Sequence, residues 1–206
     1  SNFNTSNVTS MSHMFDGCSN LLNLDVSNFD TSKVTGMIAM FYNCSSLTNI
    51  DVSNFDTSNV KSMEAMFGLC SNLNTLDLSN FDTSQVANLG GMFTNCSKLA
   101  SIDVSRFDTS KVTDMNSIFN TCSSLKSIDL SNFVTTNLTN MAYMFSNCSG
   151  LTSLDLSSFT TSKVTSMSYI FSGCKNITVL NISSFDLSDS NTVLTRFGSM
   201  FNGMSS

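Results

Sequence analysis

The chain has 206 residues, of which only 12% are charged and none is proline, and its formal net charge at pH 7 is −6. This balance excludes a nucleic-acid-binding module, because such modules present a basic surface to phosphate groups. No run of about 18 apolar residues is present, so the sequence predicts no transmembrane segment.

Phenylalanine recurs every 26 residues along the chain. The members of this column are Phe3, Phe29, Phe55, Phe81, Phe107, Phe133, Phe159 and Phe185. Internal repeats of 20–50 residues are typical of solenoids, in which each unit buries its apolar face against its neighbours. The sequence therefore predicts a single solenoid over residues 1–206. Because the chain opens and closes in mid-repeat, we expect it to be a fragment of a longer surface protein.

The first predicted element of each coil is a short helix, as in residues 11–18. Met11, Met14, Phe15 and Cys18 are spaced i, i+3, i+4 and i+7, which places them on one helical face. The cysteine slot recurs with the same 26-residue period, in Cys18, Cys44, Cys70, Cys96, Cys122, Cys148 and Cys174. We interpret these residues as small buried apolar side chains that stack on one another, with a redox or metal ladder as the alternative.

The second predicted element is a short strand with the pattern L-x-x-L-x-L, as in residues 21–26. Strand alternation directs Leu24 and Val26 inward and Asp25 outward. The copies of this strand are expected to stack as a parallel sheet. The last coil, residues 185–206, carries four extra residues within 187–193, which predicts a longer loop there.

Together these elements predict an α/β solenoid. We expect a right-handed stack of about eight 26-residue coils, with a parallel β-sheet on one face and short helices on the other. The strings SNFDTSKVT (27–35), MFYNCSSLTNIDVSNFDTSNV (40–60) and MFSNCSGLTSLDLSSF (144–159) resemble the 26-residue repeats of bacterial surface proteins, the BspA-like or Treponema-type leucine-rich repeats. This resemblance covers nearly the whole chain. It implies a secreted or cell-surface location and adhesion to a host or matrix protein, and it supplies no catalytic residues.

Six aspartates share one outward slot of the predicted strand and are our strand-face candidates for binding. They are Asp25, Asp51, Asp77, Asp103, Asp129 and Asp155. Neighbouring strands lie about 4.8 Å apart, so these carboxylates form a like-charge ladder that suits a basic protein patch or a glycan. Ca²⁺ is an alternative ligand, since hard cations take carboxylate oxygens. No glycine-rich loop completes a coordination shell, so we assign no metal ligand and expect no cofactor.

Two further features are candidates for function. Tyr143 and Tyr169 share one slot in adjacent coils, with Tyr42 in a nearby slot, and exposed tyrosines suit contacts with proteins or carbohydrates. Threonines also align in two columns, which gives ice binding as a lesser alternative. The first column is Thr5, Thr31, Thr57, Thr83, Thr109, Thr135 and Thr161, and the second is Thr9, Thr35, Thr113, Thr139 and Thr165.

The sequence therefore favours a binding or adhesion module over an enzyme. His13 is the only histidine, and nothing pairs with it as a nucleophile. The aspartate columns offer no second group in a distinct environment that would divide acid and base roles. The alternative to a binding module is a structural spacer or stalk that binds nothing.

Overall fold

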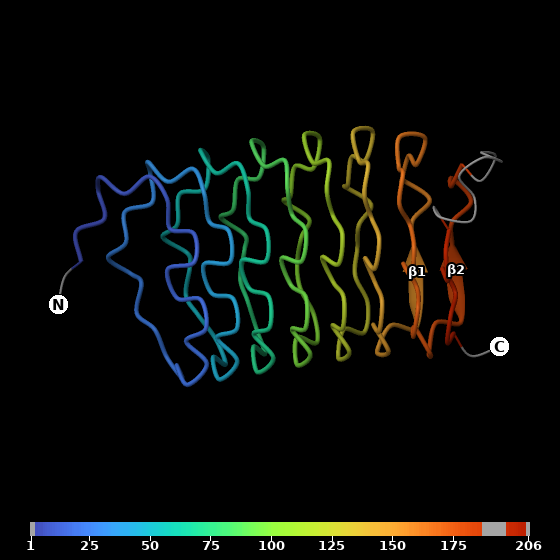
Figure 1. Cartoon of the computed structure of the whole chain (residues 1–206), viewed down its shortest axis with the longest axis horizontal. Helices are drawn as coiled ribbons and strands as arrows, with labels where there is room; N and C mark the ends of the chain where they lie inside the picture. Colours follow the sequence, from blue (N-terminus) through green and yellow to red (C-terminus); the bar gives the residue numbers. More distant parts are fainter. Residues whose placement is uncertain (1–2, 187–196, 205–206) are drawn as a thin grey trace.

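The chain folds as an elongated stack of coils. The structure is a computed structural model and describes residues 3–186 and 197–204. Figure 1 shows the coils succeeding one another along one axis, with the two termini at opposite ends of the stack. Parallel bridges join residues 26 positions apart, from Ser10 with Gly36 to Asn140 with Ser166. The predicted solenoid is therefore confirmed, and its structural period equals the sequence period.

The core consists of the columns that the sequence predicts. Phe41 and Phe67 are fully buried, and their rings stack with centroids 5.5 Å apart. Phe93 and Phe119 repeat this arrangement at 5.7 Å. Six of the seven cysteines are also buried, and all seven are free thiols. Aromatic burial through the coils between the two ends is thus a main source of stability for this stack.

The cysteine column packs through a hydrogen bond as well as through its volume. Each buried thiol reaches a main-chain carbonyl of the previous coil, as Cys96 does to Phe67 O at 3.1 Å. Burial raises the pKa of the Cys70 thiol to about 12 and that of Cys44 to about 11. The six members from Cys44 to Cys174 are therefore neutral buried thiols, as we inferred from the registry of the column, whereas Cys18 is exposed, contrary to that inference.

The predicted helices are wrong, and the reason lies in the backbone. Each coil has two positions with positive φ in the M-x-x-M-F-x-x-C segment, such as His13 (φ 60°) and Gly17 (φ 75°). A right-handed helix cannot contain such left-handed residues. Apolar spacing of i, i+3, i+4 and i+7 here arises from a series of turns, and the described residues contain no helix.

Hydrogen bonding in this turn segment runs between coils. The N–H of Phe15 donates to Met40 O of the next coil at 2.9 Å, whereas the N–H of Asp16 donates back to His13 O at 3.3 Å. Along this segment, the N–H groups of successive residues thus donate alternately to a carbonyl of the next coil and to a carbonyl of their own turn. The resulting ladder ties the coils together along one side of the solenoid.

The predicted sheet is present but much smaller than expected. It consists, in the described part of the chain, of β1 (Ser153–Asp155) and β2 (Val179–Asn181), which pair in parallel with Leu154 opposite Leu180. Earlier copies keep the alternation of buried and exposed residues without forming strands. Main-chain bonds between coils are concentrated on the turn side, so the strand side is held less closely. The longer loop predicted within residues 187–193 lies outside the described residues.

Candidate functional site

An open hollow of about 670 Å³ lies on the strand side of three successive coils. Its lining comes from residues 49–53, 75–77 and 101–103. The apolar part is formed by Ile50, Leu76 and Ile102, which lie at the inward positions of their segments. The exposed polar part comes from the outward positions on either side of them. The hollow therefore combines an apolar base with a polar border.

The coils that line the hollow are not joined by a main-chain ladder on this side of the stack. In β1 and β2, the segments around Leu154 and Leu180 are joined by a strand ladder. Among the residues that the structure describes, no main-chain hydrogen bond joins residues 49–52 to 75–78, or 75–78 to 101–104. The hollow thus lies on a side of the stack without a main-chain ladder between these coils. The carbonyls of Val52 and Val104 are nevertheless occupied, since they accept hydrogen bonds from Asn80 Nδ2 and Asn132 Nδ2 at 3.1 Å, whereas the main-chain groups of Ile50, Leu76 and Ile102 make no main-chain hydrogen bond in the described chain.

Three of the six candidate aspartates meet at this hollow. Asp51, Asp77 and Asp103 line it, and all three are exposed. Asp25, Asp129 and Asp155 occupy the same column but do not belong to the lining. The structure therefore divides a uniform sequence column into a central group at the hollow and three flanking members.

Each central carboxylate is fixed by the serine two residues further on. Asp51 Oδ1 accepts a hydrogen bond from Ser53 N–H at 3.0 Å, and Asp103 Oδ1 accepts one from Ser105 N–H at 2.9 Å. Hydrogen bonds from these serines lower the pKa of both carboxyl groups below the ordinary value. The hollow is therefore bordered by oriented carboxylates that are ionised at neutral pH.

The tyrosine candidates lie in the turn segments, outside the lining of the hollow. The rings of Tyr143 and Tyr169 are stacked with centroids 4.9 Å apart, as expected for one slot in adjacent coils, and Tyr143 is 41% exposed. Tyr42 is not brought to this pair. Its ring covers Gly68, where an added Cβ would lie 2.9 Å from the Tyr42 Cδ2 atom.

The first threonine column is not an exposed array, which removes it from the ice-binding hypothesis. All of its members are buried. Thr31 Oγ1 donates to Asp56 O at 3.0 Å and accepts from Asp56 N–H at 2.7 Å. The second column is exposed, but Thr139 Oγ1 already donates to Thr113 O at 2.9 Å. In both columns, the threonine hydroxyl groups form hydrogen bonds with main-chain groups of an adjacent coil.

Within residues 3–186 and 197–204, no three His, Cys, Asp or Glu side chains gather closely enough to hold a metal ion. His13 lies at the surface, with its Nδ1 atom 2.9 Å from Asp16 Oδ2. The part of the chain that the structure describes also lacks any helix with the length and apolarity that a bilayer crossing requires.

Sequence reasoning identified the aspartates but missed the hollow. The inward Ile50, Leu76 and Ile102 look like ordinary core positions, because their slot is apolar in every copy. The same slots recur in the coils on both sides, so nothing in the sequence limits the hollow to residues 49–103.

Comparison with known proteins gives one family match. The family model described as "Mycoplasma protein of unknown function, DUF285" matches residues 1–102, 62–178 and 97–206, so its overlapping copies cover the chain. This match agrees with the resemblance to bacterial 26-residue repeats. The sequence has no match among curated proteins.

Among solved structures, the chain is similar to bacterial leucine-rich repeat proteins. The T. pallidum leucine-rich repeat protein TpLRR is 21% identical with a TM-score of 0.48, over 70% of this chain and 60% of that one. A leucine-rich repeat protein from Eubacterium ventriosum is 20% identical with a TM-score of 0.43, over 82% and 48% of the two chains. A leucine-rich cell surface protein from Faecalibacterium prausnitzii is 18% identical with a TM-score of 0.33, over 97% and 80%. The chain thus spans 60% and 48% of the first two proteins.

Proposed function

Since the chain belongs to the DUF285 repeat family, we propose that it is a non-enzymatic binding module of a bacterial surface protein, secreted or held at the cell surface. Its ligand is a host or matrix protein, or a glycan, and the strand-side hollow is the binding site. The observation that carries this proposal is the hollow itself, which places three carboxylates around an apolar base.

The chemistry of the hollow favours a protein segment with lysine or arginine side chains. Asp51, Asp77 and Asp103 are ionised at neutral pH, and no ion pair is recorded for them within the described chain. Lysine and arginine carry apolar stems below their charged groups, so they suit an apolar base with an acidic border. The main-chain groups of Ile50, Leu76 and Ile102 make no main-chain hydrogen bond in the described chain, so they can add hydrogen bonds to an extended peptide.

The test uses two matched triple variants. One replaces Asp51, Asp77 and Asp103 with Asn, and the control replaces Asp25, Asp129 and Asp155 with Asn. Both remove three charges from one column, but only the first set lines the hollow. Binding partners come first from an array of matrix proteins and glycans, and affinities are then measured by biolayer interferometry at two salt concentrations.

We expect the hollow variant to lose about tenfold in affinity, since three exposed ion pairs at about 0.5 kcal/mol each sum to about 1.5 kcal/mol. The control variant should change little. Equal losses in both variants would show that only net charge matters, and would reject the hollow as the site. Saturable binding to no member of the array would favour the alternative function, a structural spacer.

Two lesser proposals concern other groups. The stacked Tyr143 and Tyr169 pair offers a second surface for a protein or glycan, and Tyr143→Ala would weaken binding if this surface is used.

Calcium binding by the aspartate column is tested by titrating Ca²⁺ during thermal melting. An unchanged melting temperature would remove the calcium proposal.

A further inference from the structure

Two tyrosines occupy a turn slot that the other coils fill with smaller side chains. The slot is the third residue of each turn segment, and in chain order it holds His13, Ala39, Ala65, Gly91, Ser117, Tyr143 and Tyr169. Every member has a positive φ, including Tyr143 (57°) and Tyr169 (59°). Glycine adopts this conformation without strain, as at Gly91, whereas tyrosine does not. Backbone strain of this kind is concentrated at functional positions, so the two rings are candidates for a role beyond folding.

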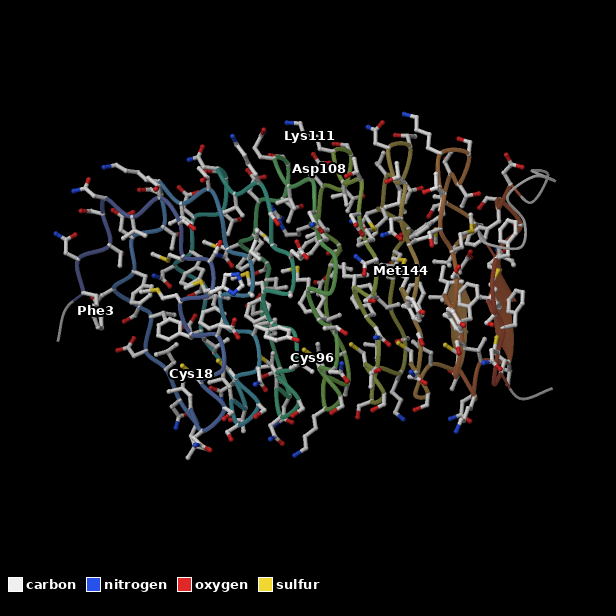
Figure 2. All side chains as sticks on the ribbon, viewed as in Figure 1. Phe3, Cys18, Cys96, Asp108, Lys111 and Met144 are labelled. Atoms are coloured by element: carbon white, nitrogen blue, oxygen red, sulfur yellow. The ribbon has the colours of Figure 1, made fainter. Side chains whose placement is uncertain are left out.

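The two tyrosine rings stack along the axis of the solenoid. Their planes are within 6° of parallel and their centroids are 4.9 Å apart, close to the spacing of about 4.8 Å between neighbouring strands. Tyr143 is 41% exposed, although the next residue, Met144, is fully buried within the stack (Figure 2). Tyr169 covers one face of the Tyr143 ring. The other face points toward the preceding coil, where the slot holds Ser117, whose N–H donates to Ala142 O at 2.8 Å.

Polar groups without partners lie beside this open ring face. Ser117 is half-buried, and its hydroxyl group makes no hydrogen bond in the described chain. Asn120 lies in the same turn, since its N–H donates to Ser117 O at 3.0 Å. Its Oδ1 atom accepts from Thr121 Oγ1 at 3.1 Å, whereas its Nδ2 group donates to nothing among the described residues. These two slots face the same side of the turn, because the equivalent His13 and Asp16 side chains meet at 2.9 Å.

The surface around the tyrosine pair is uncharged. The turn segments that form it are residues 115–121, 141–147 and 167–173, and their sequences contain no charged residue. The carboxylate next to them in the chain, Asp114, is already occupied: Oδ1 accepts from Asn116 N–H at 2.8 Å and Oδ2 accepts from Asn140 Nδ2 at 3.2 Å. A lysine or arginine side chain would find an aromatic face here but no carboxylate in these segments. The surface therefore fits a neutral polar ligand, unlike the acidic hollow.

We propose that the open face of the Tyr143 ring binds one pyranose ring of an uncharged glycan. The C–H groups on one side of a pyranose pack on the negative face of an aromatic ring, while the hydroxyl groups at its edge bond to polar neighbours. The pyranose takes the next place in the stack after Tyr169 and Tyr143, and its hydroxyl groups bond Ser117 Oγ and Asn120 Nδ2. Tyr169 supports the Tyr143 ring from behind and is a positioning residue. The proposal rests on the binding function proposed above but does not involve the strand-side hollow.

The probe is an array of uncharged oligosaccharides of glucose, mannose and galactose, with oligogalacturonate as the charged comparison. Affinities of the 206-residue chain for the bound members are measured by isothermal titration calorimetry. We expect saturable binding of an uncharged member, and binding about tenfold weaker for Tyr143→Ala, which removes the ring face. Tyr143→Phe keeps the ring face and should stay within about threefold of the wild type.

Tyr42→Ala is the matched control. It removes a tyrosine ring from the same kind of turn segment, but that ring lies over Gly68 and not beside the pair, so binding should be unchanged. The triple Asp→Asn variant of the hollow should also keep its affinity for the oligosaccharide. Failure of the hollow and failure of the tyrosine site are therefore separate results.

Three outcomes overturn the proposal. They are saturable binding of no uncharged oligosaccharide, preference for the charged comparison, and equal losses in Tyr143→Ala and Tyr42→Ala. If a matrix protein binds less tightly to Tyr143→Ala while no glycan binds, the pair is a protein contact and the glycan assignment is wrong. Circular dichroism spectra establish that each variant is folded.

Discussion

The hydroxyl group of Thr109 bonds both main-chain groups of Val134 in the next coil. Thr109 Oγ1 donates to Val134 O at 3.0 Å and accepts from Val134 N–H at 2.8 Å. The threonine is fully buried. Its neighbours in the column make the same pair of bonds, as Thr57 does with Asp82. One side chain per coil thus satisfies a donor and an acceptor that have no ladder partner.

Replacing Thr109 with Val tests this role. Valine keeps the shape of threonine but leaves the N–H and C=O groups of Val134 without a partner, which costs about 1–3 kcal/mol of unfolding free energy. Urea unfolding followed by circular dichroism measures the change. The control is Thr113→Val, since the exposed Thr113 hydroxyl makes only one bond, to Ala87 O at 3.3 Å. Its effect should stay within about 0.5 kcal/mol, and equal effects would contradict the proposed role of Thr109.

The cysteines should divide sharply in their reactivity. Cys18 is exposed, while the other six thiols are buried. Burial raises the pKa of the buried members, to about 12 for Cys70, so they remain neutral thiols at pH values where an ordinary thiol ionises. We expect a disulfide reagent at about pH 8 to modify one thiol in the native chain and all seven in denaturant. Rapid modification of more than one native thiol would show that the cysteine column is accessible.

The sequence predicted the core better than the secondary structure. Every phenylalanine, methionine and cysteine column owes its burial to registry, which the 26-residue period reveals directly. The helices were wrong because Ala39 and Tyr143 adopt positive φ although neither residue type favours it. Nothing in their identity signals this. The backbone conformation follows from bonding to the next coil, which is a long-range property.

The sequence predicted the exposed aspartates of the candidate site but not the hollow that three of them line. Strand alternation placed Asp51 and Asp77 outward, and the structure confirms that both are exposed. Alternation also suggested a continuous sheet, but pairing of strands is limited in the described chain to β1 and β2. The same apolar and polar alternation stands in every coil, so the sequence does not show which copies pair as strands and which line the hollow.

Positive φ at Ala65 gives a prediction in the stabilising direction. Ala65 has φ 52°, and the equivalent position one coil later is Gly91 with φ 62°. An alanine held in the left-handed conformation lowers the free energy of unfolding by about 1–2 kcal/mol. Replacing alanine with glycine lowers it by about 0.5–1 kcal/mol, because glycine gives the unfolded chain more conformational freedom. Ala65→Gly should therefore raise the unfolding free energy by about 0.5 kcal/mol. Ala87→Gly is the control, because Ala87 does not have a positive φ. This variant should have a free energy of unfolding lower by about 0.5–1 kcal/mol. A loss of the same size at Ala65 would refute the strain argument.

The strand-column aspartates give a pH dependence whose sign can be worked out. Hydrogen bonds from serine side chains and backbone lower the pKa of each member; these are Asp25, Asp51, Asp77, Asp103, Asp129 and Asp155. The folded pKa values thus lie below the unfolded value of about 3.9. Their contribution to stability is present above that value and is lost as the pH falls through the folded values.

We therefore expect the melting temperature to hold steady from about pH 7 to 5 and to fall below about pH 4. Circular dichroism melts across this range measure it. A variant with all six aspartates replaced by Asn is the control, because the amide oxygen still accepts from the serine N–H group but does not titrate, so its decline should be shallower. Repulsion between neighbouring carboxylates acts in the opposite direction. Asp103 and Asp51 raise the pKa of Asp77, but by less than the hydrogen bonds from Ser79 lower it. A melting temperature that rises on acidification would mean that repulsion along the column outweighs these hydrogen bonds.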